Sequence, residues 1–283
     1  MAKIAYVSDL HLEFLNENNY AAGMLRAVLT DNSDGADAIV LAGDIVEARL
    51  LVVPDDSTKV NIRDNTLQLF EELAKNYPQV FLIMGNHEHY RGTLEKTQSI
   101  FEQATAHIPN FTVLQNSTAE IGDVKVFGTT LWTDCGGPAN EWFVQRGMND
   151  YKLIKTSTPT YRKLRAADTV REHNKSLVML RELLRQNSAE KCAVFTHHAP
   201  HIDMVAPQYK NRPGDYLQYA FWSDQTGLIN EHDNLLLWVS GHTHARIRTQ
   251  IGNTHTVSNA LGYIGYEIGV SDINDYKPEI IEI

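Results

Sequence analysis

Five short groups of residues in this sequence could bind metal ions, and each follows shortly after an apolar run. The groups are Asp9-Leu10-His11, Gly43-Asp44, Gly85-Asn86-His87-Glu88, His197-His198 and Gly241-His242-Thr243-His244. Any one of them alone is more often a turn or a satisfied polar contact. Five together favour a metal site, and their mixture of carboxylate, imidazole and amide groups suits borderline divalent ions such as Mn, Fe, Zn or Ni. A site made only of oxygen atoms would suit Mg or Ca instead.

The apolar runs that precede these groups have the features of buried strands. Each is rich in β-branched or aromatic residues, and each is continuously apolar rather than alternating. The runs cover residues 4–7, 38–42, 80–84, 192–196 and 235–239. Because ligands of open α/β sheets bind outside the carboxyl ends of the strands, we expect the five groups to meet at one edge.

Helical patterns lie between these runs and indicate an α/β fold with a largely parallel sheet. They cover residues 61–77, 93–107 and 160–186, the last with Thr158 as its N-cap and Pro159 at its first position. Four further segments alternate more openly and predict a second sheet. These are residues 112–114, 124–130, 247–251 and 254–258. Neither an internal repeat nor a flexible linker is found, so residues 1–283 are interpreted as one domain.

In their order and spacing, the five groups resemble the motifs of the calcineurin-like metallophosphoesterases. That family has Asp-x-His, Gly-Asp-x-x-Asp, Gly-Asn-His-Glu/Asp, a lone His and Gly-His-x-His, and the resemblance runs from Asp9 to His244. The stretch from Asn259 to Tyr263 also resembles the Asn-x-x-Gly-Tyr of bacterial and phage-type members. The resemblance implies a four-layer α/β/β/α sandwich of two mixed sheets that holds two divalent metal ions.

The resemblance assigns the metal ligands by position. Asp9, His11 and His244 would hold the first ion, Asn86, His197 and His242 would hold the second, and Asp44 would bridge both. A shared anion suits two ions that lie ~3.5 to 4 Å apart, and such a pair can clamp the attacking and leaving oxygens of an in-line phosphoryl displacement. The implied nucleophile is a hydroxide that bridges the two ions.

The resemblance also assigns the proton donor. His87, next to the ligand Asn86, is expected to point away from the metals and to protonate the leaving oxygen. In the protein phosphatases its orienting partner is the second Asp of Gly-Asp-x-x-Asp, and Glu47 stands at that position here. An alternative is that Glu47 only caps the segment that follows it. Those phosphatases continue with an Arg that binds phosphate, whereas this sequence has Ala48.

Two segments without clear periodicity, residues 131–158 and 199–222, are interpreted as lids over the metals. The candidate substrate-binding residues are Trp132 and Arg146 in the first segment, His201 in the second, and Arg91 after His87. The aromatic side chains would contact a base or aryl group, and the basic ones would contact phosphate. Alternatively, the aromatic side chains pack on the sheet edges as part of the core, and Arg91 is a solvated residue at a helix start.

Composition narrows the expected partners and location. The 25 Lys and Arg against 35 Asp and Glu give a formal net charge of −10, which repels long nucleic acid. Cys135 and Cys192 are too few for a disulfide framework, which favours a reducing compartment. All apolar runs are far shorter than the ~20 residues that cross a bilayer, and the start lacks the features of a secretory signal. We therefore expect a cytoplasmic protein without a membrane partner.

These observations predict a binuclear metal-dependent phosphoesterase that acts on a phosphodiester or a small phosphorylated substrate. Three alternatives stay open. A protein Ser/Thr phosphatase lacks support at Ala48. A nuclease of the same superfamily would normally add a capping region and a basic groove, which this acidic chain lacks. A non-catalytic metal-binding scaffold is disfavoured because every ligand position is filled.

Overall fold

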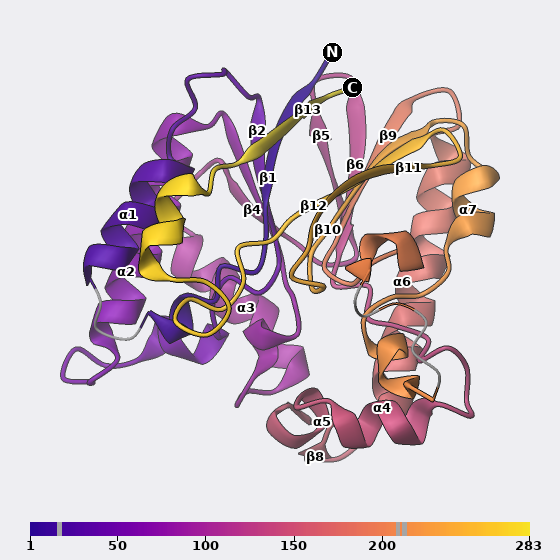
Figure 1. The fold of residues 1–283 in the computed structure, drawn as a ribbon, viewed down its shortest axis with the longest axis horizontal. Coiled ribbons are helices and arrows are strands. Elements are labelled where there is room, and N and C mark those ends of the chain that lie inside the picture. The colour runs from indigo at the N-terminus through magenta and orange to yellow at the C-terminus, as the bar shows by residue number, and fades with distance from the viewer. Residues whose placement is uncertain (16–18, 208–209, 211–213) are drawn as a thin grey trace.

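Two β-sheets packed face to face form the centre of the molecule (Figure 1). The structure is a computed structural model, and it describes residues 1–15, 19–207, 210 and 214–283. One sheet has the strand order β13-β1-β2-β3-β4, and the other has the order β11-β12-β10-β9-β6-β5. Helices cover the outer face of each sheet. The predicted four-layer α/β/β/α sandwich of two mixed sheets is therefore confirmed.

The first sheet is parallel except at one edge. Its strands are β1 (Lys3–Val7), β2 (Ala38–Ala42), β3 (Gln79–Ile83), β4 (Phe111–Leu114) and β13 (Glu279–Glu282). Only β13 runs antiparallel to its neighbour, β1. The helices that cover its outer face are α1 (Asn19–Leu29), α2 (Val60–Asn76), α3 (Thr97–Thr105) and the 3-10 helix η8 (Val270–Asp275).

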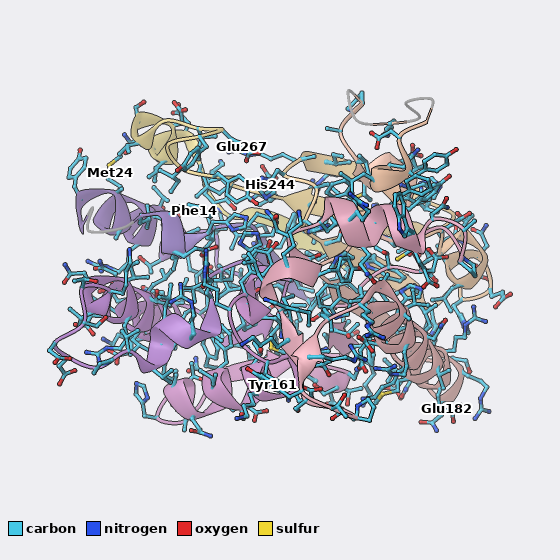
Figure 2. The ribbon with its side chains drawn as sticks, turned by 90° about the horizontal axis from the view of Figure 1, so that it is seen from below. Phe14, Met24, Tyr161, Glu182, His244 and Glu267 are labelled. Carbon is cyan, nitrogen blue, oxygen red and sulfur yellow. The ribbon has the colours of Figure 1, made fainter. Side chains whose placement is uncertain are left out.

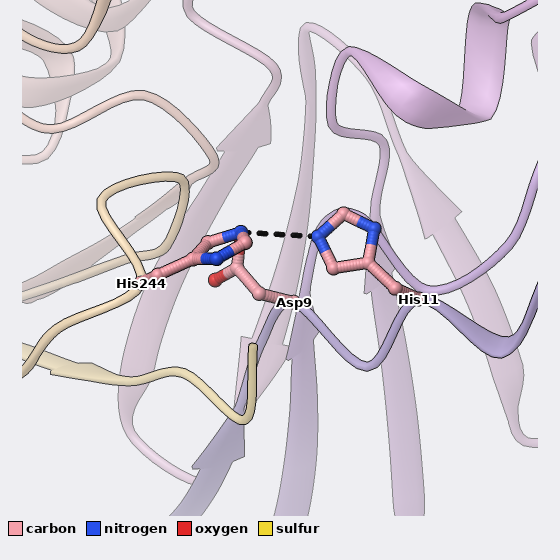
Figure 3. A group of neighbouring side chains, drawn as sticks. All are labelled: Asp9, His11 and His244. Atoms are coloured by element: carbon pink, nitrogen blue, oxygen red, sulfur yellow. Dashed lines mark hydrogen bonds and ion pairs between the residues drawn. The ribbon is translucent and has the colours of Figure 1, made fainter. Parts of the chain in front are cut away.

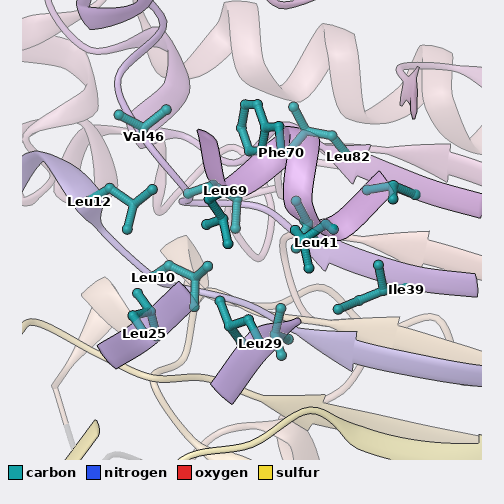
Figure 4. Close-up of a cluster of buried hydrophobic side chains, with 14 of the residues drawn as sticks. Leu10, Leu12, Leu25, Leu29, Ile39, Leu41, Val46, Leu69, Phe70 and Leu82 are labelled. Carbon is teal, nitrogen blue, oxygen red and sulfur yellow. The ribbon is translucent and has the colours of Figure 1, made fainter. Parts of the chain in front are cut away.

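The apolar runs are continuous because both faces of these strands are buried. In β1, Ala5 and Val7 join the outer cluster under the helices, whereas Ile4 and Tyr6 face the other sheet. Figure 4 shows the outer cluster, in which strand and helix side chains interdigitate. It includes Leu10, Ile39, Leu41 and Leu82 from the sheet side and Leu25, Leu29, Leu69 and Phe70 from α1 and α2.

The second sheet has four parallel strands between two antiparallel edges. Its strands are β11 (Arg246–Ile251), β12 (Thr254–Asn259), β10 (Leu235–Ser240), β9 (Lys191–Thr196), β6 (Val124–Thr129) and β5 (Ser117–Ile121). The edge strands β11 and β5 run antiparallel to β12 and β6. Helices α6 (Ala166–Gln186) and α7 (Thr226–Asn230) cover its outer face, where Leu180 and Leu228 pack with Trp238.

The two segments interpreted as lids contain short elements that lie beyond the lower ends of the sheets in Figure 1. Residues 131–158 include α4 (Glu141–Gly147), α5 (Asp150–Leu153) and β7 (Lys155–Thr156), which pairs with β8 (Arg162–Lys163). Residues 199–222 include η5 (Ile202–Met204) and η7 (Tyr216–Ala220), while residues 208–209 and 211–213 lie outside the described chain. In the part of the chain that is described, no helix is both long and apolar enough to cross a bilayer.

The predicted sheet membership of residues 112–114 is wrong. These residues belong to β4, which pairs with β3 in the first sheet and not in the second. The five buried runs are divided between both sheets. A continuous apolar run indicates a strand that is buried on both faces. Central strands of both sheets are buried in this way, so the run does not indicate which sheet the strand belongs to.

The helix expected from residue 160 begins only at Ala166. Its start is set by Asp168, whose carboxylate accepts a hydrogen bond from the backbone N–H of Arg165 (3.0 Å). The same carboxylate binds the guanidinium of Arg162, at 2.6 and 2.8 Å. An acidic side chain three residues inside the helix therefore outweighs the Thr158-Pro159 signal, and the residues before the helix pair as β8.

Gly128 on β6 marks a close approach of the two sheets. An added Cβ would lie 2.4 Å from Cβ of Leu114 and 2.7 Å from Cδ1 of Ile83, both in the first sheet. We expect Gly128→Ala to overpack this core and to lower the free energy of unfolding by about 1–3 kcal/mol. Gly23→Ala in α1, where nothing lies within 4 Å of the added Cβ, should raise it by about 0.5–1 kcal/mol. Urea unfolding measures both, and an unchanged stability of Gly128→Ala would contradict the described packing.

Candidate metal centre

The loops after β1, β2, β3, β9 and β10 bring the seven predicted metal ligands into one cluster at the carboxyl ends of both sheets. Backbone hydrogen bonds join these loops, from Asp9 N to Gly43 O (2.9 Å) and from Gly241 N to His197 O (2.9 Å). Gly43 is required for the close approach, because a Cβ there would lie 2.3 Å from Nδ1 of His197. The loop after β2 in the first sheet therefore lies directly against the loop after β9 in the second.

Asp9, His11 and His244 form the first set of donor atoms (Figure 3). Nε2 of His11 lies 3.1 Å from Nε2 of His244, which lies 3.6 Å from Oδ1 of Asp9. Asp9 and His11 are fully buried, while His244 is partly exposed. The first set therefore opens to solvent on the His244 side.

Asn86, His197 and His242 form the second set. Nε2 of His197 lies 3.1 Å from Oδ1 of Asn86 and 3.1 Å from Nδ1 of His242. All three side chains are buried. His242 presents Nδ1 to this set, and its Nε2 is buried with no hydrogen-bond partner among the described residues.

Asp44 lies between the two sets and presents one carboxylate oxygen to each. Its Oδ2 is 3.7 Å from Nε2 of His11, and its Oδ1 is 3.3 Å from Nε2 of His197. A carboxylate in this position can bind one cation with each oxygen. The predicted bridging position of Asp44 therefore agrees with its geometry.

The donor atoms fit divalent metal ions in chemistry and in spacing. Facing ring nitrogens at 3.1 Å, as in His11 and His244, need a proton or a metal ion between them. With metal–nitrogen bonds of about 2.0 Å, the ligand atoms of a tetrahedral site lie about 3.3 Å apart, close to the 3.1–3.7 Å separations found here. Burial disfavours a charged His197, but the carboxylate of Asp44 outweighs burial and raises the pKa of His197 to about 10. A proton therefore takes the place of the cation in the metal-free protein.

Outer hydrogen bonds orient three of the imidazoles. In each, Nδ1 donates to an oxygen atom and leaves Nε2 facing the donor cluster, an arrangement typical of metal-binding His residues. The acceptors are the backbone oxygen of Ala42 for His197 (3.0 Å), Glu267 for His244 (2.6 Å) and Glu13 for His11 (3.2 Å). Figure 2 shows His244 and Glu267 side by side, with Phe14 nearby.

Asp150 orients the amide of Asn86. Nδ2 of Asn86 donates to Oδ1 of Asp150 (2.8 Å), so the amide oxygen faces His197. The hydroxyl of Tyr90 donates to the same carboxylate oxygen (2.8 Å). Asp150 lies in the segment 131–158, so this predicted lid contributes a buried carboxylate that positions a donor of the second set.

Five of the seven donors have a left-handed backbone. The φ angles are 54° for Asp9, 45° for His11, 56° for Asp44, 68° for His242 and 47° for His244. Residues other than glycine rarely adopt this region, and such strain gathers at functional sites. The donors therefore converge through sharp turns immediately after the strands.

Glu88 holds two of these turns together. Its buried carboxylate accepts hydrogen bonds from the backbone N–H groups of Ile45 (2.6 Å), Gly85 (2.6 Å) and Asp44 (3.0 Å). It thereby joins the loop after β2 to the loop after β3. Glu88 belongs to the Gly-Asn-His-Glu group, but its role in joining the two loops is visible only in the fold.

His87 lies beside the donor sets with its ring held between two side chains. Its Nδ1 donates to Oε1 of Glu13 (2.9 Å), and its Nε2 lies 3.3 Å from the hydroxyl of Tyr263. Burial would raise the pKa of Glu13, but hydrogen bonds from His11 and His87 lower it to about 2. Burial likewise opposes the charged form of His87, yet Asp44 and Glu13 raise its pKa to about 9. Bound divalent cations would oppose that rise.

Glu47 does not contact His87 in the structure, contrary to the predicted pairing. Its buried carboxylate binds the guanidinium groups of Arg91 and Arg49. Its side chain also makes no capping hydrogen bond to the following 3-10 helix. The partner of His87 is Glu13, which follows His11 by two residues and so reaches the site from the first loop instead of the second.

A pocket of about 630 Å³ opens over the donor atoms. Asp44, Asn86, His87, His242 and His244 line its floor. The walls are largely apolar and aromatic. They include the neighbouring rings of Phe14, Tyr263 and Tyr266, together with Met148, Leu153, Val205 and Phe221. Both predicted lid segments therefore contribute to the walls.

Of the four predicted substrate-binding residues, only Arg91 lines this pocket. Trp132 is buried behind the second set, with its ring centroid 5.2 Å from that of His198. Arg146 lies over the ring of Trp142 (4.9 Å), and Nδ1 of His201 accepts a hydrogen bond from Asp203 N (3.1 Å). The aromatic wall comes instead from Phe14 and the loop after β12, including Tyr263 of the Asn-x-x-Gly-Tyr stretch.

The two sheets gather acidic and imidazole groups at their carboxyl ends, in clusters that could hold metal ions. The chain belongs to the calcineurin-like phosphoesterase family, whose sequence profile matches residues 2–246. The resemblance found in the motifs is therefore confirmed.

Known proteins extend this relationship over nearly the whole chain. An uncharacterised protein of Acanthamoeba polyphaga mimivirus is 26% identical over 275 residues, which cover 93% of this chain and 92% of that protein. The structure of phosphopantetheinyl hydrolase from Mycobacterium tuberculosis matches with a TM-score of 0.65 at 14% identity, over 93% of this chain and 90% of the other. A dimetal phosphatase from Danio rerio matches with a TM-score of 0.53 at 14% identity, over 91% and 86%. At these identities the two structures support the fold alone.

The shared position of Asp44 predicts unequal effects of two similar substitutions. Asp44→Asn should reduce the metal content from about two ions per chain to less than one, because both donor sets lose charge. Asp9→Asn should remove only the ion that the first set binds. Elemental analysis after dialysis against Mn measures both contents. Equal losses in the two variants would contradict the bridging position.

Proposed function

We propose that this protein hydrolyses a phosphodiester or a small phosphorylated substrate with the help of two divalent metal ions. The observation that carries the proposal is the pair of donor sets that share Asp44 at the floor of an open pocket. Membership of the calcineurin-like phosphoesterase family supports the reaction class. The residues that would hold the ions are Asp9, His11, His244 and Asp44 for one, and Asn86, His197, His242 and Asp44 for the other.

Two bound divalent ions, of which Mn, Fe, Zn or Ni suit these donors, would supply the positive charge that binds phosphate and activates water. The chain itself supplies the orientation of the donors and the proton for the leaving group. Glu267, Glu13 and the backbone of Ala42 keep three imidazoles turned toward the ions. Asp150 keeps the amide oxygen of Asn86 in place.

His87 is the proposed proton donor to the leaving oxygen. It lines the pocket floor beside Asp44, and its Nδ1 is held by Glu13. That hydrogen bond leaves Nε2, which is close to the hydroxyl of Tyr263, as the nitrogen that can give a proton to substrate. Glu13 is a positioning residue in this scheme, and Glu47 instead fixes Arg91 at the pocket wall.

The pocket walls favour a substrate with one phosphate and an apolar or aromatic group. Among the described residues that line the pocket, Arg91 is the only Arg or Lys, and its guanidinium is paired with Glu47. The metal ions would therefore neutralise most of the negative charge of the substrate phosphate. The rings of Phe14, Tyr263 and Tyr266 offer a surface for an aryl group or base. Long nucleic acid fits neither this wall nor the net charge of −10.

A reducing compartment, such as the cytoplasm, is the proposed location. Cys135 and Cys192 are both buried free thiols, which is typical of proteins that are not exposed to oxidising conditions.

Hydrolysis of bis(p-nitrophenyl) phosphate and p-nitrophenyl phosphate by stripped protein supplied with Mn, Fe, Zn, Ni or Mg tests the reaction class directly. We expect activity with at least one borderline ion and none without metal. Absence of activity with every ion and both esters, in protein that binds metal, would contradict the proposed hydrolysis and favour a binding role.

The role of His87 predicts a dependence on the leaving group. His87→Ala should retain both metals but slow the cleavage of alkyl phosphodiesters by ~10² to 10⁴-fold, because an alkoxide needs a proton to depart. Nitrophenyl esters should be affected much less. Rates for the two substrate types, with metal content determined in parallel, measure this difference. An equal loss for both types, or a lost metal ion, would contradict the assignment.

Glu13→Gln and Glu47→Gln form a matched pair that distinguishes the partner of His87. Glu13→Gln should reproduce the leaving-group dependence of His87→Ala in weaker form, because the imidazole loses the charge that aims it. Glu47→Gln should show no such dependence and should alter KM through Arg91. If Glu47→Gln showed the leaving-group dependence and Glu13→Gln did not, Glu47 would be the residue that orients His87.

A further inference from the structure

Residues 141–165 form a basic segment in an acidic chain. They include six Lys and Arg against two Asp and Glu, whereas the whole chain has 25 against 35. Of the two acidic residues, Asp150 is buried and binds Asn86. Among the six basic residues, only Arg162 forms an ion pair within the described part of the chain, with Asp168. Four of the others are exposed, namely Arg146, Lys152, Lys163 and Arg165.

Exposed aromatic rings gather on this segment and next to it. The exposed fractions are 59% for Trp142, 41% for Phe143 and 66% for Tyr161, and 44% for Tyr216 of η7. The ring of Phe143 stacks on that of Tyr216 (4.5 Å between centroids), and Trp142 packs edge-on against Phe143 (5.0 Å). None of the four rings lines the pocket over the donor atoms. They are therefore open to a contact outside the molecule.

The basic and aromatic side chains lie at one end of the molecule. Helices α4 and α5 and strand β8 are its lowest elements in Figure 1, so they face the viewer in Figure 2, which is seen from below. The guanidinium of Arg146 lies over the ring of Trp142 (4.9 Å), and Nζ of Lys155 donates to the hydroxyl of Tyr161 (2.9 Å). We call the exposed side chains of residues 141–165, together with Tyr216, the basic face.

The arrangement of the rings argues against long nucleic acid as the partner of the basic face. A base stacks on a free ring face, but Phe143 and Tyr216 stack on each other and Arg146 covers one face of Trp142. The net charge of −10 also repels a polyanion that extends across the molecule. What remains exposed is apolar ring surface between basic side chains.

A membrane surface presents groups that complement this combination. Trp and Tyr side chains lie at the headgroup level of bilayers, and clustered Lys and Arg bind anionic phospholipids. A flat surface contacts only one face of a protein, and charges beyond a Debye length of ~8 Å are largely screened. The acidic remainder of the chain therefore opposes this contact only weakly.

We propose that the basic face binds a membrane surface that contains anionic phospholipids. The ring of Trp142 would enter the headgroup region, and the exposed Lys and Arg side chains would contact lipid phosphates. Such binding needs no spanning helix, and it replaces the expectation of no membrane partner, which rested on the short apolar runs. Anionic lipids face the cytoplasm, the compartment proposed above. Gly147 and Met148 of the same segment line the pocket, so the basic face and a part of the pocket wall belong to one segment.

Vesicle co-sedimentation of the full chain, loaded with Mn and freed of excess metal, tests this proposal. We expect saturable binding to phosphatidylcholine vesicles that contain phosphatidylserine, and at least ~10-fold weaker binding to pure phosphatidylcholine. Lys152→Gln combined with Lys163→Gln should weaken the binding by about 25-fold, because each basic side chain near an anionic surface contributes about 5-fold. The matched control is Lys75→Gln combined with Arg185→Gln, at exposed positions near the ends of α2 and α6 that lead into β3 and β9. The control should bind as the wild type does.

Trp142→Ala should weaken the same binding by about 10-fold, because the ring that enters the headgroup region is lost. Tyr20→Ala removes an exposed ring from α1 and should have no effect. Thermal unfolding checks that each variant is folded. Absence of binding to the vesicles with phosphatidylserine, or equal losses in the double Lys variant and its control, would overturn the proposal.

Single-stranded DNA serves as the second probe. Binding of this DNA that depends on Lys152 and Lys163, without binding to vesicles, would overturn the proposal in favour of nucleic acid. Because these experiments measure no hydrolysis, their result is independent of the proposed function.

Discussion

The carboxylates of Asp9 and Asp44 are buried just after two neighbouring strands, and the imidazoles around them compensate their charge. Burial of one unpaired carboxylate costs several kcal/mol, because the protein interior solvates charge poorly. Four imidazoles face these two groups, and in the absence of metal a proton on His197 balances Asp44. Divalent cations would balance the buried carboxylates with more charge than a proton and would bind the surrounding donor atoms in defined directions. Charged and imidazole groups from both sheets therefore meet at this edge in clusters that could hold cations.

This constraint explains the unusual local structure around the site. The donors leave their strands through left-handed residues, which brings side chains from two sheets to one point instead of spreading them along an edge. Gly43 allows the loop after β2 to approach His197. Glu88, Glu267 and Asp150 then fix loops and rings from outside the donor shell. Left-handed residues and outer hydrogen bonds thus accompany a preorganised group of donors, several of which line the pocket.

The sequence was sufficient to predict the framework and which polar residues come together at the candidate metal centre, because both leave local patterns. Continuous apolar runs located the central strands within one or two residues, and Asp9, Asp44 and His197 follow such runs at short range. Sheet membership was not visible in the sequence, because β4 alternates like the strands of the second sheet although it is an edge strand of the first, and β9 is continuously apolar although it lies in the second. The start of α6 was misplaced because Pro159 gave a stronger local signal than Asp168.

Contacts between segments that are distant in the chain leave no local pattern in the sequence. Glu13 looks like an ordinary acidic residue after His11, and only the fold places it against His87, 74 residues further along the chain. The same holds for Asp150, which lies 64 residues from Asn86. The motif at Tyr263 was noticed, but its place beside His87 depends on how the loop after β12 returns to the first sheet. Trp132, a predicted pocket residue, lies instead behind the second set of donors, with its ring beside those of His89 and His198.

Anomalous X-ray scattering from crystals grown with Mn can show whether Asp44 joins two metal ions. We expect two anomalous peaks ~3.5 to 4 Å apart, each about 2.0–2.2 Å from a different carboxylate oxygen of Asp44. One peak should lie among Asp9, His11 and His244, and the other among Asn86, His197 and His242. A single peak, or two peaks of which only one contacts Asp44, would show that Asp44 does not bridge two ions.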